Sequence, residues 1–308
     1  MTHAKQADAR QIFQQPPRKF LDMGHSEIPY RVVGEGPDVL FVHGWPLHGA
    51  TYRKVIAELA PTHRCHVIDL PGAGESKFDR QTPIRMSAHV DVVKRAADQI
   101  GLERYAMVAQ DSGGLIARFV AANDPRVTGL ALANTEIPGH HPLLVSALAS
   151  LSRLPGFDAT MAGLMKSRRV RRSSIGFKGC FYDRSLVEGE FFDLFVRPLL
   201  ESDHAMWGAM ELARTLEHHL TDDLREAHRK LNMPVQLVWG DGDPFFPLAE
   251  ARGMVTQFPD AELHVIERAR LLVYEEHPEA FVRLALRALS GPPADARVEP
   301  RRPNRELS

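Results

Sequence analysis

Residues 106–114 read AMVAQDSGG, and they place an aspartate and a serine side by side where a buried apolar run gives way to glycines. A strand that turns sharply into a helix at a nucleophile needs small residues two positions before and two positions after it, because the strained backbone crowds its neighbours. With Asp111 at the centre these residues are Ala109 and Gly113. With Ser112 at the centre the first of them would be a bulky glutamine. The spacing therefore predicts Asp111 as the nucleophile and Ser112 as the residue that follows it.

A simpler alternative remains for the same stretch. Aspartate is a favoured residue at the start of a helix, where its carboxylate accepts backbone N–H bonds. In that alternative Asp111 is a helix cap with no chemical role.

The composition of the chain narrows the classes of function. Of the 308 residues, 44% are hydrophobic and 25% are charged, and the formal net charge is −1, so neither nucleic acid nor a membrane surface is an expected partner. Two cysteines do not make a disulfide framework, and we find neither a signal peptide nor an apolar run of membrane-spanning length. We therefore expect a cytoplasmic location.

Short apolar runs alternate with helical patterns, which favours a largely parallel sheet with helices on both faces. Residues 18–23 and 28–33 are typical of an opening hairpin. Six further strands are expected over residues 38–44, 64–70, 105–110, 129–134, 234–240 and 261–267. Two helices between them are expected over residues 50–60 and 86–101.

One long segment, about 137–231, interrupts this alternation with a helical pattern. We expect it to form an inserted cap over the C-terminal edge of the sheet, where open α/β sheets bind ligands. The remainder divides into a flexible arm (1–17), a core (18–136 and 232–290) and a tail (291–308). The proline and charge content of the tail predicts disorder.

Five motifs occur in a fixed order along the chain: HGWP (43–46), DLPGAGESKF (69–78), VAQDSGG (108–114), NTEIPG (134–139) and VWGDGDPFFP (238–247). Together they resemble the α/β-hydrolase fold, and within it the branch of epoxide hydrolases and haloalkane dehalogenases. The resemblance covers about residues 20–288. It implies an α/β fold with a mostly parallel, eight-stranded sheet flanked by helices and an inserted helical cap. It implies no cofactor and no metal.

The resemblance also implies roles for individual residues. Asp111 would attack carbon to form an ester, which divides one difficult displacement into two easier steps. The backbone N–H groups of Trp45 and Ser112 would form the oxyanion hole. Asp243 would be the acid that orients a histidine, with Asp241 as the alternative acid.

The histidine of the family pattern is missing. It belongs in a glycine–histidine pair before the two glutamates of EEHPE, and Arg270 and Leu271 occupy those positions. Leucine has no basic group to activate water, so this departure argues against ordinary hydrolysis. Tyr274 could share a helical face with Leu271, although packing is the simpler interpretation. The cap histidines His204 and His218 are two other candidates for the base.

Three cap residues are further candidates for substrate binding. Tyr182 is the single cap tyrosine and could protonate an epoxide oxygen, whereas His204 and Trp207 repeat at helical spacing. Leu271 and Tyr274 are candidates from the core. Packing is an alternative for each of the cap residues and for Tyr274.

Two hypotheses of function follow. The first is an enzyme in which Asp111 serves as nucleophile or as acid–base group on an epoxide, a carbon–halogen bond or an ester-like substrate, or in non-hydrolytic chemistry of the lyase or cyclase type. The second is a catalytically degenerate protein that binds a small apolar ligand. Either way we expect a small, mainly apolar organic molecule as partner, and a monomer or a homodimer.

Overall fold

The sheet of this protein has eight strands in the order β1-β2-β4-β3-β5-β6-β7-β8. The computed structural model describes residues 11–290, so most of the predicted arm and the whole predicted tail (291–308) lie outside the described residues. The strands are β1 (Lys19–Asp22), β2 (Glu27–Val33), β3 (Asp38–Val42), β4 (Arg64–Ile68), β5 (Tyr105–Gln110), β6 (Val127–Ala133), β7 (Val235–Gly240) and β8 (Ala261–Ile266).

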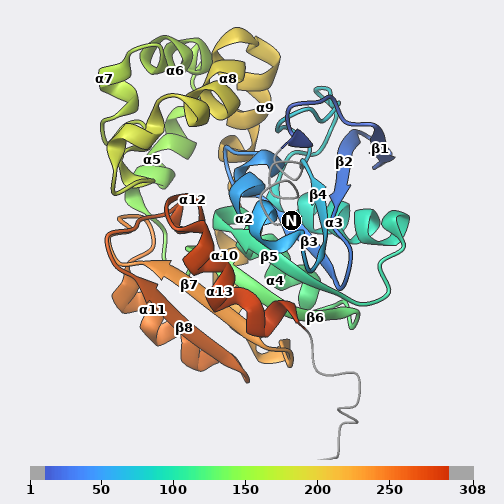
Figure 1. Ribbon diagram of the computed structural model, residues 1–308. Helices are drawn as coiled ribbons and strands as arrows, with labels where there is room; N and C mark the ends of the chain where they lie inside the picture. Colours follow the sequence, from blue (N-terminus) through green and yellow to red (C-terminus); the bar gives the residue numbers. More distant parts are fainter. Residues whose placement is uncertain (1–10, 291–308) are drawn as a thin grey trace, which may run out of the picture.

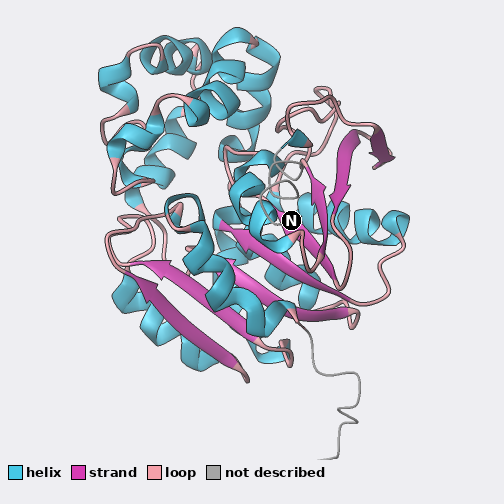
Figure 2. Ribbon diagram, viewed as in Figure 1, coloured by secondary structure: helices cyan, strands magenta, loops and turns pink. Residues whose placement is uncertain are grey.

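The pairing of the strands matches the predicted fold class. β1 and β2 form an antiparallel hairpin, and β2 pairs antiparallel with β4. Every other neighbouring pair is parallel. The prediction of a mostly parallel, eight-stranded sheet flanked by helices is therefore confirmed (Figures 1 and 2).

Helices cover both faces of the sheet. Those outside the segment between β6 and β7 are η1 (Gly49–Tyr52), α2 (Arg53–Leu59), α3 (Met86–Ile100), α4 (Asp111–Ala121), α11 (Leu248–Met254), η5 (Val255–Gln257), α12 (Val273–Glu276) and α13 (Pro278–Leu289). Helices α2, α12 and α13 pack together on one face, while α3 and α4 pack together on the other. Within residues 11–290 no helix is long and apolar enough to cross a membrane.

Between β6 and β7 the chain forms helices and turns, which we call the helical insertion. Its helices are α5 (Leu143–Leu151), α6 (Phe157–Met165), α7 (Arg168–Arg171), η2 (Phe177–Gly179), η3 (Arg184–Val187), η4 (Phe192–Val196), α8 (Arg197–Glu201), α9 (Asp203–Arg214) and α10 (His218–Lys230). Helices α5 to α9 form a layer beyond one end of the sheet (Figure 1). The last helix, α10, packs against α4 beside the sheet.

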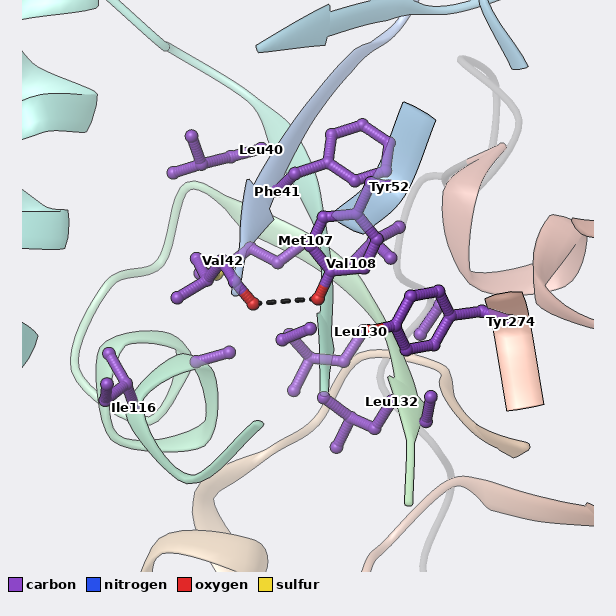
Figure 3. Packing of buried hydrophobic residues seen from close by; sticks show 14 of the residues in the cluster. Leu40, Phe41, Val42, Tyr52, Met107, Val108, Ile116, Leu130, Leu132 and Tyr274 are labelled. Carbon is purple, nitrogen blue, oxygen red and sulfur yellow. Dashed lines mark hydrogen bonds between the residues drawn. The ribbon is translucent and has the colours of Figure 1, made fainter. Parts of the chain in front are cut away.

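The centre of the sheet supplies the hydrophobic core. All six residues of β5 and all six of β7 are buried, as expected for parallel strands covered on both faces. Figure 3 shows Leu40, Met107 and Leu132 in this cluster. In the same cluster the Tyr52 hydroxyl donates to the Val42 carbonyl at 2.9 Å. This hydrogen bond fixes the helix after β3 against that strand.

A buried ion pair anchors the segment that follows β8. Arg53 on α2 donates to both carboxylate oxygens of Glu275 on α12, at 2.9 and 2.7 Å, and both side chains are 3% exposed. Glu276 accepts the backbone N–H of Arg270 at 2.9 Å and that of Tyr182 at 2.8 Å. The two glutamates therefore hold the loop that carries position 271 against both the core and the helical insertion.

The described part of the predicted flexible arm is held in place. Arg31 on β2 donates to the backbone carbonyls of Ile12 and Gln15, at 3.0 and 3.3 Å. Residues 11–17 thus lie against the edge of the sheet rather than forming a loose extension.

The turn after β5 tolerates no side chain at position 113. A Cβ atom on Gly113 would lie 2.4 Å from the carbonyl oxygens of both Val42 and His43, which are backbone atoms of β3 and the loop after it. We expect Gly113→Ala to lower the free energy of unfolding by about 2–3 kcal/mol, because the overpacked backbone must shift. Denaturant unfolding followed by circular dichroism measures this.

A matched control lies in the helical insertion. A Cβ on Gly163 in α6 would meet no atom within 4 Å, so Gly163→Ala should be neutral or should stabilise the protein by up to about 1 kcal/mol. Equal effects of the two substitutions would contradict the close approach at Gly113.

Candidate active site

Asp111 occupies the turn between β5 and α4 in a left-handed backbone conformation, with φ of 48°. Such a conformation is uncommon for a residue other than glycine and marks stored strain. The backbone N–H of Asp111 donates to the Asn134 carbonyl at 2.9 Å. On the opposite side, a Cβ on Gly44 would lie 2.6 Å from the Asp111 Cβ. The segments after β3 and β6 thus hold the turn from both sides.

The Asp111 carboxyl accepts a hydrogen bond from the backbone of the loop after β3. The Trp45 N–H donates to Asp111 Oδ2 at 2.9 Å and also lies 3.0 Å from Ser112 Oγ. The Ser112 side chain therefore turns toward this loop and leaves the tip of the turn to Asp111. Burial raises the pKa of the Asp111 carboxyl, and the backbone N–H groups of Ser112 and Trp45, which were proposed as an oxyanion hole, oppose that shift.

Asp243 lies in the loop after β7, and its carboxylate is fully engaged without an imidazole. Its Oδ1 accepts the backbone N–H groups of Phe245 and Phe246, at 2.8 and 3.3 Å. Its Oδ2 accepts the Asn134 side-chain N–H at 2.6 Å. Asp243 is 7% exposed, whereas the alternative acid, Asp241, is exposed. The amide of Asn134 therefore bonds the proposed acid.

Position 271 lies beside the loop after β7 that carries Asp243, but its side chain is a hydrocarbon. Leu271 is 7% exposed, and the preceding residues, Ala269 and Arg270, approach the Gly240 backbone so closely that a Cβ there would lie 2.5 Å from them. The Arg270 guanidinium donates to the Lys178 carbonyl at 2.7 Å. Burial raises the pKa of Asp243, and the charge of Arg270 is one of the influences that oppose this shift. The position that the resemblance assigns to the histidine thus lies beside the loop that carries Asp243, and its side chain is not a base.

Tyr274 does not replace that base. Its side chain is fully buried, and its hydroxyl lies 2.7 Å from Thr51 Oγ1. Its ring packs on Tyr52, with the ring centroids 5.2 Å apart (Figure 3). Burial raises the pKa of Tyr274 well above its usual value, which makes proton removal by this group unfavourable. The packing interpretation of Tyr274 fits these contacts.

A second carboxyl, that of Glu136, lies next to Asp111. Thr135 Oγ1 is 2.8 Å from both the Asp111 backbone carbonyl and Glu136 Oε2, and it accepts a hydrogen bond from Arg118 at 2.9 Å. Because a hydroxyl has one hydrogen, it donates to only one of these oxygens at a time. A protonated Glu136 would donate to the Thr135 hydroxyl, and that hydroxyl would then donate its own hydrogen to the backbone carbonyl of Asp111.

Arg118 supplies positive charge beneath this pair. It is 0% exposed, and its guanidinium lies 3.9 Å from Glu136 Oε2. Burial lowers its pKa to about 10, and attraction to Glu136 opposes that shift. Arg118 is therefore still protonated at neutral pH, and it favours a negative charge on Glu136.

The carboxyls of Asp111 and Asp243 hold protons unusually firmly. Burial raises the pKa of Asp111 to about 8, with Glu136 as the next largest cause and Asp243 as a further one. Burial likewise raises the pKa of Asp243 to about 7 and raises that of Glu136. Near neutral pH the site is therefore a set of interacting carboxyl groups, partly protonated, rather than a carboxylate paired with an imidazole.

Asp111 lines a cavity of about 80 Å³ between the core and the helical insertion. Glu136, His141 and His218 line the same cavity. The Nδ1 atoms of His141 and His218 are 3.0 Å apart, so one ring donates to the other. Burial, followed by the proximity of His141, lowers the pKa of His218. With His140, this pair makes up the histidines that line the Asp111 cavity within residues 11–290, and these are candidates for a base.

The other candidates from the insertion do not line this cavity. Tyr182 is 47% exposed, with the Arg268 guanidinium over its ring at 5.3 Å. His204 stacks on Phe78 with ring centroids 4.3 Å apart, and Trp207 packs on the same phenylalanine. None of these three side chains is in the lining of the Asp111 cavity.

Sequence reasoning missed four members of the site: Arg118, Asn134, Glu136 and His141. Two of them belong to the NTEIPG motif, whose polar residues follow a buried strand at the ligand-binding edge of the sheet. That position could have marked them as site residues. Nothing in the sequence marks Arg118 in this way, because a single arginine in a helix is normally exposed.

Comparison with known proteins agrees with the fold described above. A sequence model of the α/β hydrolase fold family matches residues 37–278. The pimeloyl-[acyl-carrier protein] methyl ester esterase of Aeromonas salmonicida is 27% identical over 264 residues, which cover 82% of this chain and 94% of that protein.

Solved structures show the same fold. An α/β hydrolase fold protein from Burkholderia ambifaria has a TM-score of 0.73 and 21% identity, covering 87% of this chain and 96% of that one. A reconstructed ancestral haloalkane dehalogenase has a TM-score of 0.68 and 23% identity, covering 86% and 96% of the two chains.

The raised pKa of Asp111 predicts how stability depends on pH. The pKa of Asp111 is about 8 in the folded protein, whereas the pKa of an unfolded aspartate is about 4. The protonated carboxyl therefore contributes its full stability below pH 4, and this contribution is lost as the pH rises to 8. Asp111→Asn does not titrate. Its Tm relative to the natural protein should therefore increase between pH 5 and pH 8, by about 5 °C.

Differential scanning calorimetry at several pH values measures this difference. Asp241→Asn, a change at an exposed aspartate, is the control and should show no such trend. A Tm difference for Asp111→Asn that stays constant with pH would contradict the raised pKa.

Proposed function

Because the chain belongs to the α/β hydrolase fold family, we propose that it is an enzyme in which the Asp111 carboxyl performs acid–base chemistry on a small, mainly apolar substrate beneath the helical insertion. The observation that carries this proposal is the surroundings of Asp111: Glu136 and Asp243 act on its carboxyl, and a leucine stands at the family's histidine position. A carboxyl with a pKa near the working pH is a good proton donor and acceptor.

The proposed reaction needs no activated water. Protonated Asp111 donates its proton to a substrate oxygen while the bond from that oxygen to carbon breaks. The resulting carboxylate then takes a proton from the neighbouring carbon, and the electron pair of that C–H bond becomes the new carbon–carbon double bond. The Trp45 N–H, 2.9 Å from Oδ2, stabilises the carboxylate between these steps. An isomerisation or elimination of this kind leaves the enzyme unchanged and adds no oxygen from solvent.

A second candidate function is the nucleophilic one, and the left-handed turn at Asp111 favours it. Ionised Asp111 would form a C–O bond to the substrate while the bond from that carbon to its leaving group breaks. Hydrolysis of the ester would then need a base. The hydrolase names of the relatives, an esterase and a dehalogenase, make this the competing proposal.

Small epoxides in water labelled with ¹⁸O distinguish the two functions. For the acid–base enzyme we expect an allylic alcohol without ¹⁸O, and loss of this product in Asp111→Asn. Mass spectrometry of the products measures the label. A diol that carries ¹⁸O over many turnovers would instead establish hydrolysis and overturn the acid–base proposal.

The reactivity of Asp111 toward an alkyl halide tests the site independently. With 1-bromobutane the intact protein should gain one butyl group and release bromide, at a rate that rises at least about tenfold from pH 6 to pH 9 as Asp111 ionises. The adduct should persist, because position 271 supplies no base. Intact-mass spectrometry measures both the rate and the persistence.

Two variants serve as controls for this reaction. Asp111→Asn should form no adduct. The double variant Arg270→Gly with Leu271→His should form the adduct and then release butanol. The single variant Arg270→Gly should form the adduct but should not release butanol. Rapid loss of the butyl group from the natural protein would show that another base acts, and the His141–His218 pair would be the first to replace.

A further inference from the structure

The outward face of helix α5 is apolar. Leu143, Leu144, Ala147 and Leu151 recur at a spacing of three or four residues, so they share one face of the helix. All four are exposed, and Leu143 is 87% exposed. Within α5 no residue is charged, and Ser150 is the one exposed polar residue. A helix at the surface of a globular protein normally presents polar side chains to water, so this face departs from the usual pattern.

The opposite face of α5 packs on the rest of the protein. Val145, Ser146 and Leu148 line the cavity of Asp111, and Ala149 is buried. The same helix therefore covers the Asp111 cavity with one face and exposes leucines to solvent with the other. Because the inner face makes these contacts, the outward leucines are not needed to hold α5 in place.

The exposed apolar surface continues beyond α5. Leu154 in the turn after α5 and Leu164 on α6 are also exposed. Helices α5 and α6 both pack on α9, in the layer beyond the end of the sheet (Figure 1). Of the nine large hydrophobic side chains that are exposed within residues 11–290, six belong to residues 143–175. Single exposed leucines are normal, whereas such a concentration marks an interaction surface.

The same segment is strongly basic. Residues 143–175 contain six arginines and lysines but a single acidic residue, Asp158, and that carboxylate pairs with Arg214. Lys166 and Arg169, which follow α6, are exposed. Neither forms an ion pair within the described residues 11–290. The formal net charge of −1, from which we expected no membrane partner, averages over the whole chain and conceals this local excess of positive charge.

We propose that the helical insertion docks on the surface of a membrane that contains anionic lipids. The exposed leucines of α5 and of the turn after it enter the boundary between headgroups and acyl chains, and Lys166 and Arg169 contact lipid phosphates. An apolar helical face accompanied by basic residues is typical of helices that lie in this boundary. A second copy of the chain would present the same positive charge, whereas an anionic bilayer complements it. This surface goes beyond the proposed chemistry of Asp111.

Flotation of the full-length protein with lipid vesicles tests the proposal. One set of vesicles contains phosphatidylcholine and phosphatidylglycerol in equal amounts, and the other contains phosphatidylcholine alone. We expect the protein to bind the anionic vesicles at least about tenfold more tightly than the neutral ones, because each basic residue near the surface adds to the attraction. The variant Lys166→Gln with Arg169→Gln should reduce this preference to within about threefold.

A second double variant tests the apolar part of the surface. Leu143→Ser with Leu151→Ser should weaken binding to the anionic vesicles at least about tenfold, because less apolar surface enters the bilayer. Both leucines are exposed, so the fold should be retained, and circular dichroism checks this. The matched control is Val32→Ser with Leu286→Ser, which removes two exposed apolar side chains outside the insertion and should bind as the natural protein does.

Three results would overturn the proposal. The first is no binding of the natural protein to anionic vesicles, or equal binding to both kinds. The second is an equal loss of binding in the leucine variant and in its control. The third is unchanged vesicle binding in the leucine variant together with conversion of a dimer to a monomer, measured by light scattering, which would assign the surface to a second copy. Asp111→Asn should bind vesicles normally, so the outcome is independent of the chemistry proposed for Asp111.

Discussion

The left-handed backbone at Asp111 is the constraint on which the site depends. A non-glycine residue keeps such a conformation only where its surroundings determine it. Here the loop after β3 approaches so closely that Gly44 and Gly113 have no room for a side chain. The loop after β6 accepts the Asp111 N–H. These contacts also place the Trp45 N–H against the Asp111 carboxyl and the NTEIPG motif next to it. The strained turn therefore determines the relative positions of Asp111, Trp45 and Glu136.

The balance of charge around this turn differs from that of a carboxylate–imidazole site. Asp111, Glu136 and Asp243 act on one another in a buried region, and Arg118 is the cation that lies 3.9 Å from Glu136. Desolvation nevertheless raises the pKa of Glu136 and of Asp243, although Arg118 opposes that shift at Glu136 and Arg270 opposes it at Asp243. A histidine at position 271 would add a further site of positive charge. Leucine there leaves the protons on the carboxyls, which is why the chemistry we propose is proton transfer.

The strands and the turn at Asp111 could be predicted from the sequence because each depends on local pattern. A buried strand is a short apolar run, and a tight turn needs small flanking residues, as Ala109 and Gly113 show. The residues of the helical insertion could not be placed in this way. His204 and Trp207 share a helical face, but periodicity does not say what that face contacts, and in the structure it is Phe78. Burial of Arg118 also depends on packing between elements far apart in sequence.

Trp45 links the turn at Asp111 to the helical insertion. Its backbone N–H donates to Asp111, while its indole N–H donates to the Ala209 carbonyl of α9 at 2.6 Å. The indole is therefore engaged with the helical insertion and is not directed at a leaving group. The position of this one residue thus depends on the strained turn and on the helical insertion together.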